Sequence, residues 1–203
     1  TYMLDFDGPI NVNQVGVYAQ TEYKTNGWGF LAALRVDNHD YYGSNLLPKA
    51  AITKKVGDGT FRLTYGKGMA VPSLLNLEGY LFGGLIIGNG LGFTLSDGSK
   101  INKLDVETIN SFEVGYKGSI DKKFYMDVNA YYNLSENFIS PLTQLATNGR
   151  TVTHRGDQAL STIAGANPNF VLTYSNFGKV DTYGVDLGFS YYFTDDLKGI
   201  VNY

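Results

Sequence analysis

The chain has 203 residues, contains no Cys and carries a formal net charge of −3 at pH 7. The absence of Cys excludes disulfide bonds and thiol chemistry, and the interspersed charges argue against a nucleic-acid partner, which needs clustered Lys and Arg. The composition, with 16 Tyr, 12 Phe and 25 Gly, favours strands joined by tight turns. No apolar run approaches the roughly 18 residues that a spanning helix needs.

The first predicted element is a β-hairpin. Residues 14–23 alternate between apolar and polar side chains, and residues 28–37 do the same. Asn26-Gly27 lies between them and is a strong signal for a hairpin turn. A period of two is typical of a strand with one apolar and one polar face. We therefore expect two antiparallel strands that share an apolar face.

The same pattern predicts six further strands, at residues 48–56, 60–67, 110–119, 124–130, 182–191 and 197–203. The turns near residues 25, 58, 121 and 195 are short, whereas we expect long connections at 38–47, 67–109 and 134–179. Short periplasmic turns that alternate with long extracellular loops are typical of an up-and-down membrane barrel. Strands of about ten residues also match the 9–11 or so that cross a bilayer at a tilt.

Aromatic side chains flank the short turns. They are Tyr23, Trp28, Phe61, Phe124, Tyr125, Tyr192 and Phe193. Amphipathic rings at one level are expected where a barrel meets the membrane interface. Lys54 lies on the apolar set of its strand, and its position near a predicted turn lets the long side chain reach the interface.

The polar set of each strand is expected to face the lumen, because a charge on the lipid side at the bilayer midplane costs about 2–4 kcal/mol. The lumen-facing candidates are Arg35, Asp37, Arg62 and Glu113. Two interpretations stay open for them. They pair with one another or with a plug inside the barrel, or they line the route of a substrate.

The long connection 67–109 holds the candidate ligand contacts Tyr80, Phe82 and Phe93. The segment either captures a ligand outside the cell or packs on its neighbours. The run Gly88-Asn89-Gly90-Leu91-Gly92 lacks the strand, helix and spacing of a phosphate-binding loop, so we expect a flexible loop there. His39 lies near Asp37 and Asp40, but we expect no metal, no cofactor and no catalytic residue.

Taken in order, several segments resemble the barrel strands of TonB-dependent receptors. They are Val15-Gly16-Val17-Tyr18-Ala19-Gln20, Phe61-Arg62-Leu63-Thr64-Tyr65-Gly66, Asn110-Ser111-Phe112-Glu113-Val114-Gly115-Tyr116-Lys117 and Tyr183-Gly184-Val185-Asp186. The resemblance implies an all-β, antiparallel up-and-down transmembrane barrel, of which residues 1–203 supply about eight strands out of about 22. The plug domain and the remaining strands are expected to be absent from this chain.

The resemblance also implies a function. Such a protein is a transporter and not an enzyme. It lies in the bacterial outer membrane and imports a scarce nutrient: a metal chelate, cobalamin, a glycan or a peptide. Its implied partners are outer-membrane lipid, the TonB energy-transducing complex acting through the missing plug, the nutrient itself and a surface lipoprotein.

Two alternatives stay open at this point. One is a complete eight-stranded outer-membrane barrel with a structural or adhesive role, and the other is a soluble secreted β-domain that binds carbohydrate.

Overall fold

The computed structural model describes residues 9–121 and 123–203. The chain divides into two compact units. The sheet unit comprises residues 13–68, 109–135 and 180–203, and the loop unit comprises residues 1–12, 69–108 and 136–179. Each unit is described by itself. Among the described residues, no helix is long and apolar enough to span a bilayer.

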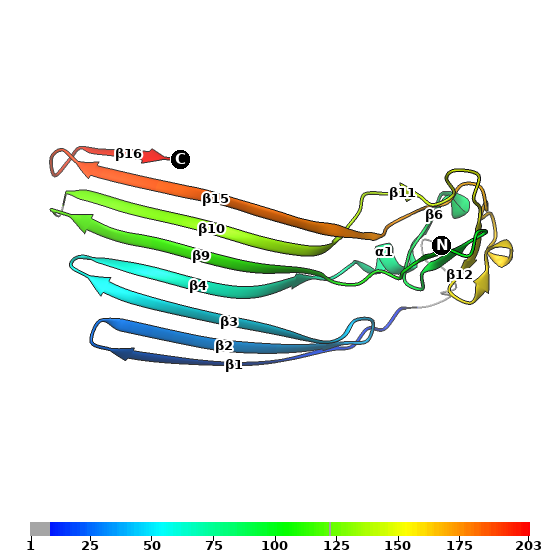
Figure 1. Cartoon of the computed structure of the whole chain (residues 1–203), viewed down its shortest axis with the longest axis horizontal. Coiled ribbons are helices and arrows are strands. Elements are labelled where there is room, and N and C mark those ends of the chain that lie inside the picture. Colours follow the sequence, from blue (N-terminus) through cyan, green and yellow to red (C-terminus); the bar gives the residue numbers. More distant parts are fainter. Residues whose placement is uncertain (1–8, 122) are drawn as a thin grey trace. The chain divides into compact units, whose positions relative to one another are not determined.

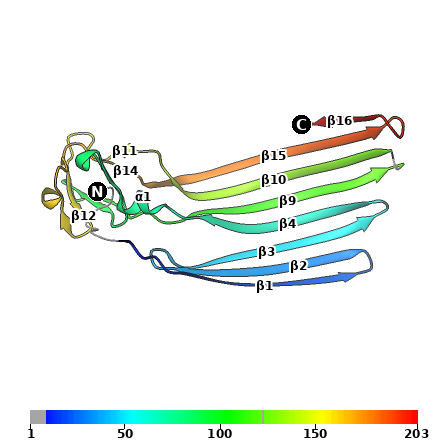
Figure 2. The ribbon, with the colours of Figure 1, turned by 180° about the vertical axis from the view of Figure 1, so that it is seen from behind.

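The long strands form one sheet of eight, in the order β1-β2-β3-β4-β9-β10-β15-β16 (Figure 1; Figure 2). Each long strand pairs with the long strand that precedes or follows it along the chain, which confirms the up-and-down order. The sheet has two edges, β1 and β16, and this open topology contradicts the alternative of a closed eight-stranded barrel. The strands are β1 (Gln14–Thr25), β2 (Trp28–His39), β3 (Gly43–Val56), β4 (Gly59–Ala70), β9 (Glu107–Ile120), β10 (Phe124–Ile139), β15 (Asn176–Tyr192) and β16 (Lys198–Asn202).

The turn between β1 and β2 is built by the predicted Asn-Gly pair. Asn26 has a φ of 47° and Gly27 a φ of 76°. Positive φ at both central residues is the geometry whose twist matches that of the flanking strands. Tyr23 lies opposite Phe30, and Thr25 lies opposite Trp28. The predicted first hairpin is therefore confirmed.

The expected long connection at 38–47 is wrong. Strand β2 continues to His39 and β3 begins at Gly43, so only three residues join them. Asn38 lies opposite Ser44, which puts polar side chains on the face that is apolar elsewhere. The strands therefore continue beyond the end of the apolar band, and the loss of hydrophobic alternation does not mark their end. The connections from β4 to β9 and from β10 to β15 are long, as predicted.

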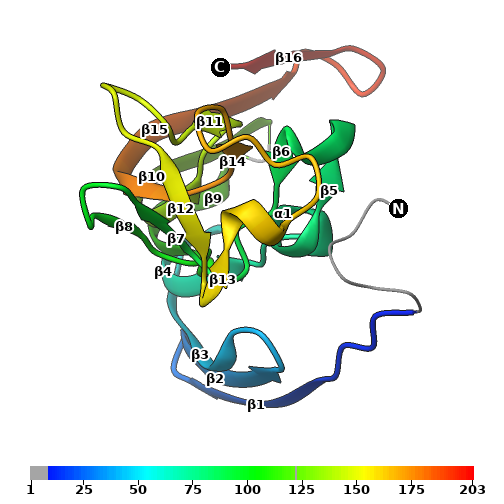
Figure 3. The same cartoon turned by 90° about the vertical axis from the view of Figure 1, so that its right-hand side faces the viewer.

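Two small sheets lie in the loop unit, as far as the structure describes it (Figure 3). One has the order β11-β14-β6-β5, with β11 (Thr143–Gln144), β14 (Leu172–Thr173), β6 (Ile86–Ile87) and β5 (Tyr80–Leu81). The other has the order β13-β12-β7-β8, with β13 (Gln158–Ala159), β12 (Val152–Arg155), β7 (Phe93–Leu95) and β8 (Lys100–Ile101). Each sheet joins strands from both long connections.

The described part of the loop unit also contains three short helices: α1 (Leu74–Glu78), η1 (Phe82–Gly84) and η2 (Leu160–Thr162). Ser73 caps α1 by accepting a hydrogen bond from the backbone N–H of Asn76. The hydrophobic core of the unit consists of Ile87, Phe93, Leu95, Leu145, Ala146, Val152, Leu160, Ile163 and Val171. Both long connections supply core residues, so they fold together.

Candidate functional site

The register of β1 to β4 separates two faces of the sheet. Residues directly opposite each other in neighbouring strands lie on the same face. One row runs Glu22, Leu31, Ala51, Thr64 and the next row on that face begins Gln20, Ala33, Lys49. Rows on the other face read Tyr23, Phe30, Ile52, Leu63 and Val17, Val36, Leu46. The predicted division into a polar and an apolar face is therefore confirmed for these strands.

Arg35 and Asp37 form a bidentate ion pair on the polar face. Arg35 donates from Nε to Asp37 Oδ2 at 2.7 Å and from Nη2 to Oδ1 at 2.9 Å. Asp37 is only 2% exposed, and it lies opposite Gly16 on β1. A Cβ at position 16 would approach Asp37 Oδ1 to 2.4 Å. Gly16 therefore makes the space in which the carboxylate is held.

Arg62 and Glu113 each bond to a neutral partner on the same face. Arg62 Nη2 donates to Asn129 Oδ1 at 3.4 Å, and Thr64 Oγ1 donates to Glu113 Oε2 at 3.4 Å. Both residues line a hollow of about 340 Å³ together with Leu31, Lys49, Ala51, Thr64, Tyr65, Gly66 and Ser111. Of the four lumen-facing candidates, the structure thus pairs Arg35 with Asp37 and places Arg62 and Glu113 around one hollow.

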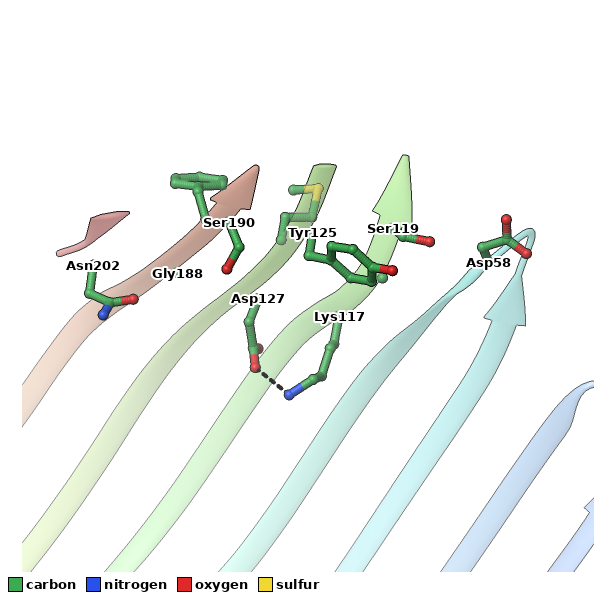
Figure 4. A pocket seen from close by; sticks show the side chains of 11 residues that line it. Asp58, Lys117, Ser119, Tyr125, Asp127, Gly188, Ser190 and Asn202 are labelled. Atoms are coloured by element: carbon green, nitrogen blue, oxygen red, sulfur yellow. Dashed lines mark hydrogen bonds and ion pairs between the residues drawn. The ribbon is translucent and has the colours of Figure 1, made fainter. Parts of the chain in front are cut away.

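A second hollow of about 380 Å³ lies near the tight turns of the sheet unit (Figure 4). Lys117 on β9 and Asp127 on β10 point toward each other there, with Nζ 2.9 Å from Oδ2. Tyr125, Ser119 and Ser190 lie around this pair (Figure 4). The sequence gave no signal for this hollow, because its lining comes from four strands and a turn that are distant along the chain.

Lys54 lies beside an aromatic side chain on the apolar face. Its Nζ is 4.5 Å from the ring centroid of Trp28 and donates to the backbone carbonyl of Asn26 at 3.3 Å. Phe61 lies opposite Lys54 in the register, and its ring is 4.6 Å from that of Tyr116. The charge is therefore at the turn, next to rings, as expected for a lysine that reaches the membrane interface.

The three candidate ligand contacts in the loop unit differ in environment. Phe93 is 2% exposed and packs in the hydrophobic core of the loop unit, so its side chain is not accessible to a ligand. Tyr80 packs against that core and its hydroxyl donates to the carbonyl of Ala164. Phe82 is 80% exposed, with a φ of 53°. Phe82 is thus the most exposed of the three, Tyr80 is half-buried, and contact of either residue with a ligand stays a prediction.

The Gly88–Gly92 run is a packed part of the loop unit, so the expected flexible loop is wrong. A Cβ at Gly88 would lie 2.5 Å from the backbone carbonyl carbon of Leu77, and one at Gly90 would lie 2.9 Å from its oxygen. Asn89 is fully buried, and its Nδ2 donates to the carbonyls of Asn102 and Tyr174 at 2.9 and 2.8 Å. The two glycines allow the backbone to pack closely against Leu77, and the side-chain amide of Asn89 between them donates hydrogen bonds to two backbone carbonyls.

A buried ion pair between Arg155 and Glu78 joins the two long connections. Arg155 Nη2 donates to Glu78 Oε2 at 2.6 Å and to the carbonyl of Leu77 at 2.8 Å, while Nε donates to the carbonyl of Gly88 at 2.9 Å. The side chains are 3% and 11% exposed. Sequence reasoning missed this pair, because the partners are 77 positions apart and no motif links them.

The two histidines have aromatic and hydroxyl neighbours in the part of the chain that the structure describes. In the described ranges, no group of three or more His, Cys, Asp and Glu side chains could hold a metal ion. His39 stacks on Tyr42 with ring centroids 4.8 Å apart, and its Nδ1 accepts from the backbone N–H of Tyr41 at 3.1 Å. His154 is exposed on β12, with Nδ1 3.1 Å from Thr153 Oγ1.

The chain is similar to several solved outer-membrane receptors. The siderophore receptor PirA from Pseudomonas aeruginosa is 18% identical, with a TM-score of 0.66 over 94% of this chain and 33% of that protein. The ferric enterobactin receptor PfeA of the same species is 19% identical in its enterobactin complex, with a TM-score of 0.66 over 94% and 26%. The FrpB iron transporter from Neisseria meningitidis is 17% identical, with a TM-score of 0.58 over 94% and 25%.

The chain thus spans between a quarter and a third of the length of these structures. A search of curated proteins gave no match. The family model described as "TonB dependent receptor-like, beta-barrel" matches residues 2–203. The chain therefore belongs to the family of TonB-dependent receptor β-barrels, whose members are receptors and transporters of the bacterial outer membrane and not enzymes.

Proposed function

We propose that this chain supplies part of the barrel of a receptor that binds a scarce nutrient outside the cell and imports it. The observation that carries this proposal is the division of the sheet into a polar and an apolar face, in a chain of this family. A charge on the lipid side costs about 2–4 kcal/mol at the midplane, so Arg35, Asp37, Arg62 and Glu113 belong on the lumen side.

A ferric chelate is the ligand that we propose to test first. PirA is named a siderophore receptor, PfeA a ferric enterobactin receptor and FrpB an iron transporter. Their resemblance to this chain lies in the fold, and it supports iron as the first choice over cobalamin, a glycan or a peptide. No residue of this chain is assigned to that ligand by the resemblance.

The partners of the whole receptor follow from the family alone. Import would draw energy from the TonB complex, acting through a plug domain that we place outside residues 1–203. A surface lipoprotein would contact the extracellular side, and outer-membrane lipid would cover the apolar face. Each of these partners is part of the same proposal.

Uptake of radioactive iron tests this function. Cells of the source bacterium, grown under iron limitation, are compared with a strain in which the gene for this receptor is deleted. We expect the deletion to abolish uptake of at least one ferric chelate from a panel of catecholate, hydroxamate and citrate chelates, and a protonophore to block the wild-type uptake. Equal uptake of every chelate by the two strains would contradict an iron receptor.

A further inference from the structure

One face of a sheet in the loop unit presents a row of polar side chains. Strands β8, β7 and β12 are neighbours in this sheet (Figure 3). In their register, Lys100 lies opposite Thr94, and Thr94 lies opposite His154. The adjacent row is Ile101, Phe93 and Arg155, of which Phe93 and Arg155 are buried. Successive residues of a strand point to opposite faces, so the row with Lys100, Thr94 and His154 is on the outer face.

A hollow of about 240 Å³ adjoins this row and is lined by both long connections. Its shape depends on two glycines. Gly92 has a φ of 81°, and a Cβ there would lie 2.8 Å from the carbonyl of Ile101. Gly156 donates its N–H to the carbonyl of Gly92 at 2.9 Å. The side chains that line the hollow include Leu91, Thr94, Lys100, Asn102, Lys103 and Asp157.

The charge of this hollow is positive. Lys100 and Lys103 are exposed, and among the described residues that line the hollow Asp157 is the one carboxylate. Within the described residues, the ion pairs of the loop unit are Arg150–Asp97, Arg155–Glu78 and Lys179–Glu136, and none involves either lysine. Two cations against one anion in a concave site attract a small anion, and ammonium groups bind carboxylate oxygens through charge-assisted hydrogen bonds.

We propose that this hollow binds a small anion that carries several carboxylates. Lys100 and Lys103 contact the carboxylates, while the hydroxyl of Thr94, which lines the same hollow, supplies a further hydrogen-bonding group. Leu91 at the rim is 54% exposed and contacts an apolar part of the ligand. That the anion is the imported nutrient or its chelator rests on the proposed function, whereas the binding of an anion does not.

Calorimetric titration with citrate tests the site on the complete receptor that contains this chain, purified in detergent. We expect the double variant Lys100→Gln/Lys103→Gln to weaken citrate binding at least about 10-fold, because both charge-assisted contacts are lost. The double variant Lys55→Gln/Lys123→Gln removes the same charge from the sheet unit and should leave the affinity within about twofold. Inorganic phosphate at equal concentration should bind more weakly than citrate.

Acylation of lysines, read by mass spectrometry, locates the site independently of the variants. Citrate should protect Lys100 and Lys103 and leave Lys55 and Lys123 reactive. The proposal is overturned if wild-type receptor does not bind citrate at millimolar concentration, if both double variants lose affinity equally, or if phosphate competes as well as citrate does. Absence of citrate binding by the wild-type receptor, together with intact uptake of ferric chelates, would reject this site alone. Citrate binding by a receptor that supports no uptake would reject the transport function alone.

Discussion

Gly16 lies directly opposite Asp37, and a Cβ at Gly16 would come within 2.4 Å of Asp37 Oδ1. The ion pair between Arg35 and Asp37 therefore depends on a residue of the neighbouring strand that makes no polar side-chain contact itself. Gly115 has a similar position near Arg62 and Asn129, since its Cβ would lie 2.9 Å from Asn129 Oδ1. Glycines on the polar face thus create room for the charged side chains that we place in the lumen.

The first prediction is that Gly16→Ala destabilises the receptor. The added methyl group displaces the Asp37 carboxylate and breaks one or both of its bonds to Arg35. We expect a loss of about 1–2 kcal/mol in the free energy of unfolding. Urea-induced unfolding in lipid vesicles, followed by tryptophan fluorescence, measures this change.

Gly66→Ala is the matched control for that variant. Gly66 lies on the polar face of β4, and a Cβ there would meet only Lys49 Cγ, at 3.9 Å. This substitution should change the stability by less than about 0.5 kcal/mol. Equal effects of the two substitutions would contradict the steric role of Gly16. In an Asp37→Ala background the cost of Gly16→Ala should shrink, because the clash has been removed.

The second prediction compares two consecutive positions of β2. Leu34 is on the apolar face and Ala33 on the polar face, opposite Lys49. Leu34→Arg puts a charge against lipid, so we expect a loss of about 2–4 kcal/mol and a strong decrease in folded receptor in the outer membrane. Ala33→Arg adds the same side chain toward the lumen and should be tolerated. Heat-modifiable mobility on gels measures the folded fraction, and a larger effect at Ala33 would reverse our assignment of the faces.

The strands could be predicted from sequence because a barrel strand with one face toward lipid and the other toward the lumen alternates apolar and polar side chains with a period of two. This pattern placed Arg35, Asp37, Arg62 and Glu113 on one polar set. It failed at the turn after His39, because Asn38 and Ser44 are polar on the face that is apolar elsewhere. Membership in an outer-membrane family also removes the alternative of a soluble secreted domain.

The loop unit could not be predicted in the same way. Ile87 and Val171 lie in short apolar runs, and Phe93 and Val152 stand between Gly or Thr residues, without a regular period. They form one core because segments distant in the sequence meet. The Gly-Asn-Gly run at 88–90 is a recognisable local motif, but the sequence does not show why glycine is needed there. The reason is the backbone of Leu77, which packs against both glycines. Aromatic character alone therefore does not distinguish a ligand contact from a core residue such as Phe93.

The third prediction concerns the pH dependence of a turn in the loop unit. Ser99 donates from Oγ and from its backbone N–H to Asp97 Oδ1, at 2.5 and 2.9 Å, and these bonds hold the pKa of the Asp97 carboxyl below its usual 3.8. Because the pKa of Asp97 is lowered in the folded state, these bonds stabilise the turn fully at pH values above the usual pKa of the carboxyl. The stabilisation is lost as the pH falls through the lowered pKa.

The variant Ser99→Ala should raise the pKa of Asp97 toward its usual value, because the side-chain hydrogen bond is the largest cause of the shift. Carbon-13 NMR of receptor labelled at Asp carboxyls, titrated from pH 6 toward the acid limit of folding, measures this pKa. Arg150→Gln should raise it less, since the Arg150 guanidinium lies 3.6 Å away and has a smaller effect. A larger shift with Arg150→Gln would show that charge and not hydrogen bonding controls the group.

The last prediction is that the two long connections unfold together when their buried ion pair is broken. Arg155→Met leaves the carboxylate of Glu78 and two backbone carbonyls without their donor in a buried site. Removing one partner of a buried pair costs about 3–5 kcal/mol. Hydrogen exchange should therefore accelerate in residues 69–108 and 136–179 alike, while the amides of β1 to β3 keep their protection.

The double variant Arg155→Met/Glu78→Leu separates charge from packing. Replacing both partners removes the unpaired carboxylate, so we expect protection to recover by at least about half of what the single variant loses. Faster exchange in 136–179 with unchanged exchange in 69–108 would mean that the connections open independently.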